Sequence, residues 1–337
     1  MPQYTITHKN TFTYDRPVRE SVMELRMKPR DEWHQRLRGF ELYVSPRVQV
    51  KSFTDWLGNA VHHFTLPAVH VRQEIEAESH VVVEPPPALP DPEQAKGEAF
   101  GWERLEQLVR DDAGGEFLWD MLQGSHFAHR TEALTAFADG SVPERPASPL
   151  EAITKLCEAV HTGFTYQTAS TDADSPIDDA LEARAGVCQD FAHVLIAAAR
   201  HHGLPCRYVS GYLHGDAPSA DVVDLAATHA WVECFLPGYG WAGFDPTSGT
   251  PCGEHHIRTA VGRDYADVPP TKGVFRGDAG SSLSVSVHVA SLAETPRTST
   301  RARAGWVPPD APQAIPEEPL PFSYQSQQMQ QQQEAQL

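Results

Sequence analysis

Residues 186–200 constrain the fold of this chain more than any other stretch. After Gly186 the sequence is apolar on nearly every side and rich in alanine, and it stops at His202-Gly203-Leu204-Pro205. A helix that is apolar all round is normally buried, and glycine just past the last turn is a common helix end. The pattern predicts a buried helix with Cys188 at its start. A chain of 337 residues is long enough to build a core around it.

The first 83 residues show the alternation of an antiparallel β domain, sandwich-like in its strand spacing. Short runs of alternating side chains are separated by turn signals. The runs are Tyr4-Ile6-His8, Phe40-Leu42-Val44, Val69-Val71 and Ile75-Ala77, and the turns are Asp15-Arg16-Pro17, Ser45-Pro46 and Gly58-Asn59.

The remaining chain divides into three parts. Residues 84–97 begin with a proline-rich stretch that can continue neither a sheet nor a helix, which predicts a linker. Residues 98–292 contain helical patterns, among them a cap at Ser148-Pro149-Leu150-Glu151, and then strand patterns at 207–213, 229–235, 241–245 and 283–289. Residues 293–337 are rich in proline and glutamine and predict a disordered tail. We therefore expect an α+β fold, with helices and the chemistry in 98–292.

Charge and composition exclude several classes of function. Lys and Arg number 27 against 45 Asp and Glu, a net charge of −18, so nucleic acids and anionic membranes are poor partners for this chain. No apolar stretch approaches the ~18 residues of a membrane span. Five cysteines, an odd number, occur without an export-signal pattern at the N-terminus, which predicts reduced thiols in the cytoplasm.

Cys188, His229 and Asp245 together form a candidate catalytic site. At the start of a helix, the dipole and the unpaired N–H groups favour the thiolate, the nucleophilic form of cysteine. His229 begins one predicted strand and Asp245 ends the next, so the tight turn between the strands can bring both side chains together. In such an array the histidine moves a proton and the carboxylate holds the imidazole in one tautomer.

The same pattern has a structural alternative. A lone cysteine on an alanine-rich helix is more often a packing residue than a nucleophile. The other four cysteines stand in or beside apolar patterns, and we expect them to be core or loop thiols: Cys157, Cys206, Cys234 and Cys252.

Four strings resemble the transglutaminase-like superfamily, especially its bacterial branch with a β-rich N-terminal region. They are Gly-Val-Cys-Gln-Asp-Phe-Ala-His (186–193), Gly-Leu-Pro-Cys-Arg-Tyr-Val-Ser-Gly-Tyr-Leu (203–213), Thr-His-Ala-Trp-Val-Glu (228–233) and Gly-Trp-Ala-Gly-Phe-Asp-Pro-Thr (240–247). The resemblance extends to the N-terminal β segment and to the string at 262–270. It implies a papain-like core in which Cys188 is the nucleophile, His229 the base and Asp245 the orienting acid.

The resemblance also implies acyl transfer. The thiolate attacks the carbonyl of a peptide or protein amide, an amine leaves, and the thioester passes its acyl group to water or to a second amine. The oxyanion needs fixed hydrogen-bond donors. The backbone N–H of Cys188 is the natural first donor, and Gln189 is a candidate second. Tyr166, Trp231 and Trp241 are candidate pocket residues, although ordinary packing explains the two tryptophans equally well and is the favoured explanation for Tyr166.

No cofactor or metal ion is expected. Cys188, Cys206, His229 and Cys234 match no zinc spacing, the His255-His256 pair has no paired ligands nearby in the sequence, and no glycine-rich phosphate loop is present. The sequence leaves open the identity of the substrate, the acyl acceptor, the second oxyanion donor, the oligomeric state, and the roles of the N-terminal β domain and the glutamine-rich tail. The alternative of a different class is a non-catalytic protein-binding module that keeps the fold.

Overall fold

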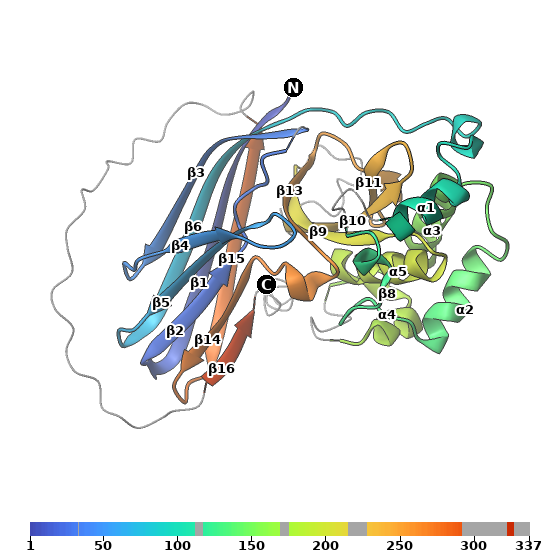
Figure 1. Cartoon of the computed structure of the whole chain (residues 1–337). Helices are drawn as coiled ribbons and strands as arrows, with labels where there is room; N and C mark the ends of the chain where they lie inside the picture. Colours follow the sequence, from blue (N-terminus) through green and yellow to red (C-terminus); the bar gives the residue numbers. More distant parts are fainter. Residues whose placement is uncertain (33, 112–116, 169–174, 215–227, 292–321, 327–337) are drawn as a thin grey trace.

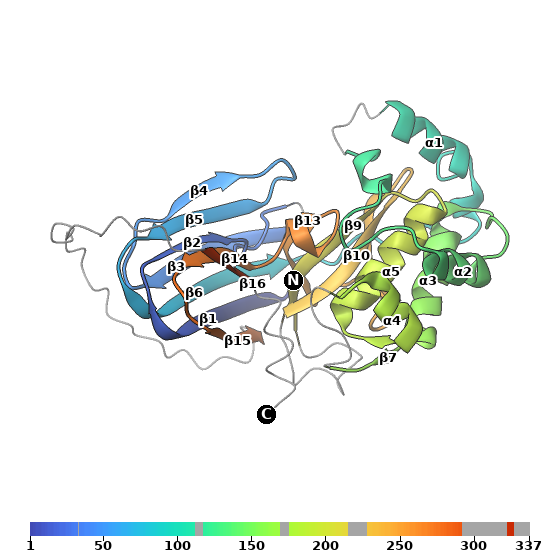
Figure 2. The same cartoon turned by 90° about the horizontal axis from the view of Figure 1, so that it is seen from below.

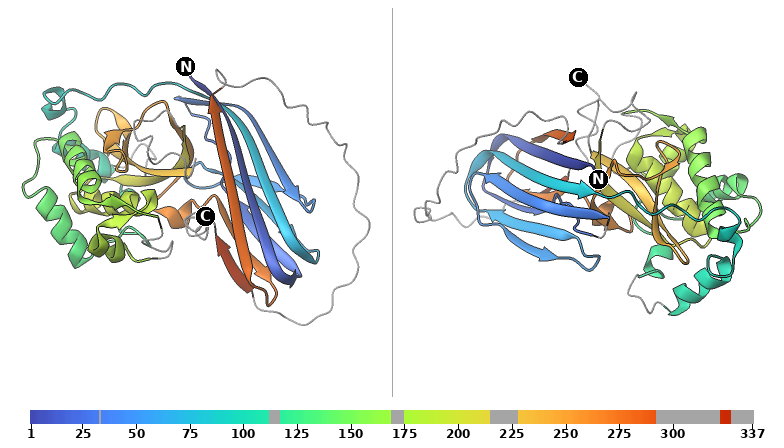
Figure 3. Two further views of the ribbon diagram at one scale, coloured as in Figure 1. Left: turned by 180° about the vertical axis from the view of Figure 1, so that it is seen from behind. Right: turned by 90° about the horizontal axis from the view of Figure 1, so that it is seen from above.

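The computed structural model describes residues 1–32, 34–111, 117–168, 175–214, 228–291 and 322–326. A lobe built of strands lies beside a lobe in which helices pack against a second group of strands (Figure 1). Views from below, from behind and from above show the same division (Figures 2 and 3). The mixture of helices and antiparallel strands confirms the predicted α+β class. Among the described residues, no helix combines the length and the apolar character needed to cross a membrane.

The β lobe is a pair of antiparallel sheets that share one core. The strand orders are β15-β1-β6-β3 and β16-β14-β2-β5-β4. The N-terminal strands are β1 (Gln3–Val18), β2 (Glu20–Leu25), β3 (Gln35–Ser45), β4 (Lys51–Thr54), β5 (Ala60–Leu66) and β6 (His70–Val83). Burial alternates along β1 and β6, so each strand turns one apolar face toward the other sheet. Phe12, Phe64, Ile75 and Phe275 meet in this core.

Later parts of the chain complete the β lobe. Strand β14 (Thr271–Arg276) pairs with β2, and β15 (Ser281–Ser291) pairs with β1. The sequence-based boundaries assigned these residues to the catalytic part, and the structure differs because alternation predicts a strand without identifying its partner. Within the predicted tail, Phe322–Ser326 form β16 beside β14, so the structure departs from the prediction there. The rest of 293–337 lies outside the described residues.

The predicted proline-rich linker connects the two lobes. After β6 the chain runs without helix or strand to η1 (Gln94–Lys96), passing over the top of the lobe that contains the helices in Figure 1. The hydroxyl of Tyr239 donates a hydrogen bond to the carbonyl of Pro87 at 2.7 Å. This bond attaches the linker to the lobe that contains the helices.

Helices follow the linker. They are α1 (Trp102–Asp111), η2 (Asp120–Leu122), α2 (Glu132–Ser141), α3 (Pro149–Gly163) and α4 (Ile177–Ala183). The predicted cap of α3 is present: the N–H of Glu151 donates to Ser148 Oγ at 3.2 Å, and the carboxylate of Glu151 accepts from the N–H of Ala147 at 3.1 Å.

Helix α5 (Cys188–His201) is the centre of the lobe that contains the helices. It contacts α2, α3 and α4 as well as β9 and β10. Its apolar side chains are buried on all sides, as the sequence predicts. Alanine allows this, because small side chains let the neighbouring helices and strands approach closely. The helix ends at His201, and two residues later Gly203 has a φ of +82°, a conformation that glycine adopts without strain.

The sheet behind α5 has the order β12-β11-β10-β9-β13. Its strands are β9 (Cys206–Leu213), β10 (Thr228–Leu236), β11 (Gly240–Asp245), β12 (Thr250–Pro251) and β13 (His256–Gly262). A two-stranded parallel pair, β7 (Thr165–Tyr166) and β8 (Ala185–Gly186), and a turn of helix, η3 (Tyr265–Asp267), complete the lobe. The strands predicted at 207–213, 229–235 and 241–245 are confirmed.

Candidate active site

Cys188 is the first residue of α5, directly after β8. The carboxylate of Asp190, one turn into the helix, accepts a hydrogen bond from the N–H of Val187 at 2.9 Å. Glycine is needed at position 186, because a Cβ there would lie 2.7 Å from Asp190 Oδ2. Asp190 therefore fixes the start of the helix, and Cys188 is held where the N-terminal dipole favours a thiolate. Its side chain is only 6% exposed.

His229, at the beginning of β10, bridges Cys188 and Asp245. Its Nε2 lies 2.9 Å from Asp245 Oδ2 at the end of the neighbouring strand β11, and the ring also interacts with the side chain of Cys188. Because Nε2 faces the carboxylate, Nδ1 is the nitrogen that can exchange a proton with the thiol. The three residues predicted from the sequence are thus brought together, with His229 between Cys188 and Asp245.

Burial and charge act in opposite directions on His229 and Asp245. Burial disfavours the imidazolium of His229, but the negative charge and hydrogen bond of Asp245, together with the interaction with Cys188, outweigh it and raise the pKa of His229 to about 10. Burial likewise opposes the charge of Asp245, and the partnership with His229 nevertheless holds its pKa well below the usual range. The pair therefore carries an imidazolium and a carboxylate at neutral pH.

Asp245 has more partners than the sequence indicates. Its Oδ1 accepts the N–H of Thr247 at 2.9 Å, and its Oδ2 lies 3.3 Å from Nε2 of His256, the first residue of β13. Sequence reasoning missed His256, because β13 pairs with β9 and its proximity to β11 is invisible in the local pattern. The expectation that His255-His256 has no ligand-type neighbours is wrong for His256.

The predicted pocket residues lie in different places. Trp231 is buried and stacks on His229, with ring centroids 6.1 Å apart and planes at 30°. Tyr166 pairs across β7 and β8 with Gly186, two residues before Cys188, and its ring meets Phe191 edge-on. Gln189 is buried next to Cys188.

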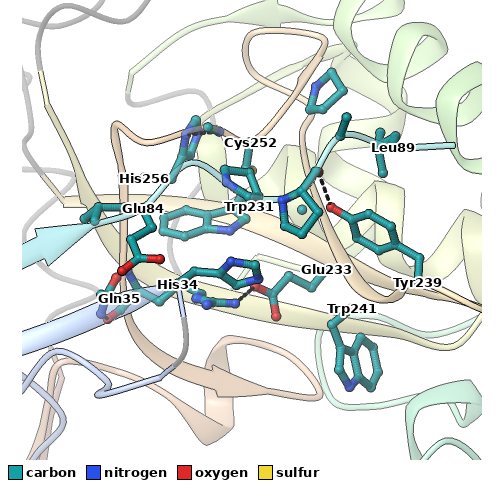
Figure 4. A pocket seen from close by; sticks show the side chains of 18 residues that line it. His34, Gln35, Glu84, Leu89, Trp231, Glu233, Tyr239, Trp241, Cys252 and His256 are labelled. Atoms are coloured by element: carbon teal, nitrogen blue, oxygen red, sulfur yellow. Dashed lines mark hydrogen bonds and ion pairs between the residues drawn. The ribbon is translucent and has the colours of Figure 1, made fainter. Parts of the chain in front are cut away.

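Trp241 lies in a separate cavity of about 370 Å³ (Figure 4). The linker, the start of β3, and strands β10 to β13 line this cavity, and Trp231 and His256 belong to its walls whereas Cys188, His229 and Asp245 do not. The guanidinium of Arg207 lies 4.1 Å from the Trp241 ring centroid. Trp241 therefore lines this cavity and contacts Arg207, away from the three candidate catalytic residues.

Two groups of side chains within the described residues have the composition of a metal site. They are Asp139, His201 and His202, and the group His229, Asp245 and His256, whose donor atoms lie within 4.8 Å of one another. In the second group the facing nitrogen and oxygen atoms are already at hydrogen-bond distances. In this structure Asp245 is therefore linked to both histidines by hydrogen bonds.

All five cysteines are free thiols in the structure. Cys157, Cys206 and Cys234 are buried and Cys252 is half-buried, as expected for core or loop thiols. Cys188 differs from them by standing at a helix N-terminus beside a histidine.

Comparisons with known proteins match both lobes. A family model described as the transglutaminase-like superfamily matches residues 138–246, and one described as the bacterial transglutaminase-like N-terminal region matches residues 4–82. An uncharacterized protein of Mycobacterium tuberculosis is 32% identical over 297 residues, which cover 85% of this chain and 92% of that protein.

Two further similarities concern named activities. A protein-glutamine gamma-glutamyltransferase of Pseudomonas aeruginosa is 34% identical over 87 residues, 25% of this chain and 13% of that protein. The crystal structure of a Cytophaga hutchinsonii protein, provisionally assigned as a cysteine protease, superposes with a TM-score of 0.68 at 21% identity and covers 96% of this chain and 98% of that one. At this identity the superposition shows a common fold.

Proposed function

This chain belongs to the transglutaminase-like superfamily, and on that premise we propose that it is a cysteine-dependent enzyme acting on peptide or protein amides through a thioester. The observation that carries the proposal is the juxtaposition of Cys188, at the N-terminus of α5, with the hydrogen-bonded pair of His229 and Asp245. Such an arrangement supplies a nucleophile, a proton carrier and a group that stabilises the charged carrier.

In the first half-reaction, the thiolate sulfur of Cys188 attacks the carbonyl carbon of the amide, and the electron pair of the C=O bond moves to oxygen. When the tetrahedral oxyanion collapses, the C–N bond breaks. The imidazolium of His229 gives its proton to the departing nitrogen, so that ammonia or an amine leaves and a thioester remains. Asp245 makes His229 a stable imidazolium before this transfer.

In the second half-reaction, neutral His229 takes a proton from water or from an amine, and the resulting nucleophile attacks the thioester carbon. The C–S bond breaks, Cys188 leaves as the thiolate, and His229 again holds the proton. Water yields a carboxylic acid, and an amine yields a new amide. Both acceptors use the same three residues, and the activity for which the Pseudomonas relative is named supports the amine.

The oxyanion requires donors that are fixed before the reaction. The first N–H groups of a helix have no acceptor within that helix, and we assign the N–H of Cys188 as one donor. The buried side chain of Gln189 is the second candidate. The stacked ring of Trp231 shields His229 from water, which strengthens its interaction with Asp245.

The test is incubation of the protein with casein, a glutamine-rich substrate, and a fluorescent primary amine, followed by peptide mass spectrometry. Amine incorporation indicates transamidation, whereas new chain termini or deamidated glutamine indicate hydrolysis. Cys188→Ala should abolish every product. Cys157→Ala is the matched control, because it removes a buried thiol that is distant from a helix N-terminus, and it should retain the products.

Thiol labelling distinguishes the enzyme from a binding module. In the proposed enzyme, iodoacetamide labels Cys188 well below the ordinary thiol pKa of about 8.5, and His229→Ala removes this reactivity. Labelling that follows an ordinary thiol in both proteins would contradict the proposal and favour a non-catalytic module. The free thiols also support a reducing compartment, and we propose the cytoplasm as the location.

A further inference from the structure

Two histidines share one oxygen of Asp245. Nε2 of His229 lies 2.9 Å from Oδ2, and Nε2 of His256 lies 3.3 Å from the same atom. The proposed reaction uses His229 and Asp245 and gives His256 no role. A carboxylate oxygen has two lone pairs and can accept from both rings.

The backbone determines which nitrogen of His256 carries the proton. The N–H of Gly253 donates to Nδ1 of His256 at 3.2 Å, so Nδ1 acts as an acceptor and is unprotonated. In a neutral imidazole the other nitrogen then carries the hydrogen. Nε2 of His256 therefore donates its N–H to Asp245, and the ring is uncharged.

The surroundings of His256 keep the ring uncharged. Burial lowers its pKa most, the nearby His229 and His255 lower it further, and the bond to Asp245 opposes the shift without reversing it. On the cavity side, the charged groups Glu233 and Arg258 are paired with each other at 2.8 Å. A neutral donor stabilises the carboxylate of Asp245 and leaves the single positive charge of the group on His229.

Packing fixes the ring in this position. Trp231 meets His256 edge-on, with ring centroids 5.1 Å apart and planes at 79°, and the same indole stacks on His229. Figure 4 shows His256 and Trp231 side by side in the wall of the cavity. Rotation of His256 away from Asp245 is thus limited by a neighbour that also contacts the proposed base.

We propose that His256 is a positioning residue for acyl transfer: its Nε2–H orients Asp245 and keeps it anionic, which in turn stabilises the imidazolium of His229 beside Cys188. This inference rests on the proposed function of the same site. The proposal adds His256, from strand β13, as a fourth side chain to the site formed by Cys188, His229 and Asp245.

The experiment measures the rate of Cys188 alkylation by iodoacetamide against pH, which requires no knowledge of the substrate. His256→Phe keeps the ring volume next to Trp231 and removes the donor, while His256→Gln keeps an N–H donor at a similar distance. A weaker imidazolium stabilises the thiolate less, so the acid limb of the profile should move up by about one pH unit in His256→Phe. In His256→Gln it should stay near the wild-type position.

An unchanged profile in His256→Phe would overturn the inference. Equal shifts in both variants would also overturn it, because the effect would then come from ring shape and not from the donor. If wild-type Cys188 itself reacts as an ordinary thiol, the proposed function fails instead. As a test that needs no variant, ¹⁵N NMR of the wild-type protein should show His256 as a neutral ring protonated at Nε2 at neutral pH, and a charged ring would contradict the inference.

Discussion

Gly211 lies directly beneath the indole of Trp231. A Cβ at position 211 would come within 2.4 Å of the Trp231 ring and 2.3 Å of the carbonyl oxygen of Ile257. Gly211 pairs with His229 on one side and with Arg258 on the other. The missing side chain on β9 leaves the space in which Trp231 contacts both histidines of the site.

Gly211→Ala should therefore destabilise the protein and disturb the site together. Overpacking of this kind typically costs about 1–3 kcal/mol, and displacement of Trp231 should also slow alkylation of Cys188 at low pH. Urea unfolding and labelling measure the two effects. Gly140→Ala, in α2 with no atom near the added Cβ, is the control and should leave both unchanged or raise stability slightly. A Gly211→Ala protein with wild-type stability would show that Trp231 adjusts freely.

The interaction of His229 with Asp245 should make the free energy of unfolding fall as the solution becomes alkaline. The pKa of His229 is raised to about 10 when folded, against about 6.5 for an unfolded histidine, so its contribution is complete below about pH 6.5 and disappears as the pH rises through 10. The free energy of unfolding should fall over this interval in the wild type and fall less in His229→Gln. Denaturation series at several pH values measure it.

His202→Gln is the matched control for this series. Burial lowers the pKa of His202, so this histidine contributes no proton-linked stability above neutral pH. In His202→Gln, the free energy of unfolding should change with pH between 6.5 and 10 with the same slope as in the wild type. Equal slopes in the wild type and in His229→Gln would contradict the raised pKa of His229.

Asp245→Asn should slow acyl transfer strongly, and because it breaks the buried pair with His229 it should also lower stability. The substitution removes the charge that stabilises the imidazolium, and loss of the carboxylate in a comparable catalytic triad lowers turnover by about 10⁴-fold. Single-turnover acylation by a p-nitrophenyl ester should slow by a factor on the order of 10³–10⁴. Asp267, in η3, forms an ion pair with Arg263, and Asp267→Asn, which removes this pair, should retain the wild-type rate. Equal rates in the two variants would rule out an orienting carboxylate at position 245.

Local sequence patterns predicted the parts of the site that depend on local structure. The apolar run after Gly186 predicted α5, and the turn between two strand patterns predicted that His229 and Asp245 would approach each other. His256 could not be found in this way, because its contact with Asp245 depends on where β13 joins the sheet. The same limit applies to β14 and β15, since strand partners in an antiparallel sheet are set by contacts between residues far apart in the chain.

Glu233 provides a final test, in the wall of the 370 Å³ cavity. Its buried carboxylate forms ion pairs with Arg207 at 2.7 Å and with Arg258 at 2.8 Å. Glu233→Gln would leave two buried guanidinium groups without this charge, and breaking a buried pair costs about 3–5 kcal/mol. The exposed pair of Glu106 and Arg145 offers the same substitution as a control, and Glu106→Gln should change stability by less than about 1 kcal/mol.

The pH dependence of the stability difference between the wild type and Glu233→Gln shows whether the charge of Glu233 is its cause. Burial opposes the charge of Glu233, but Arg207 and Arg258 lower its pKa to about 2, so its contribution is complete above the unfolded value of about 4.5 and is lost as the pH falls toward 2. The free energies of unfolding of the wild type and Glu233→Gln should therefore converge as the solution is acidified. A difference that stays constant down to low pH would mean that Glu233 acts through its shape and hydrogen bonds, since protonation removes the charge but keeps the side chain in place.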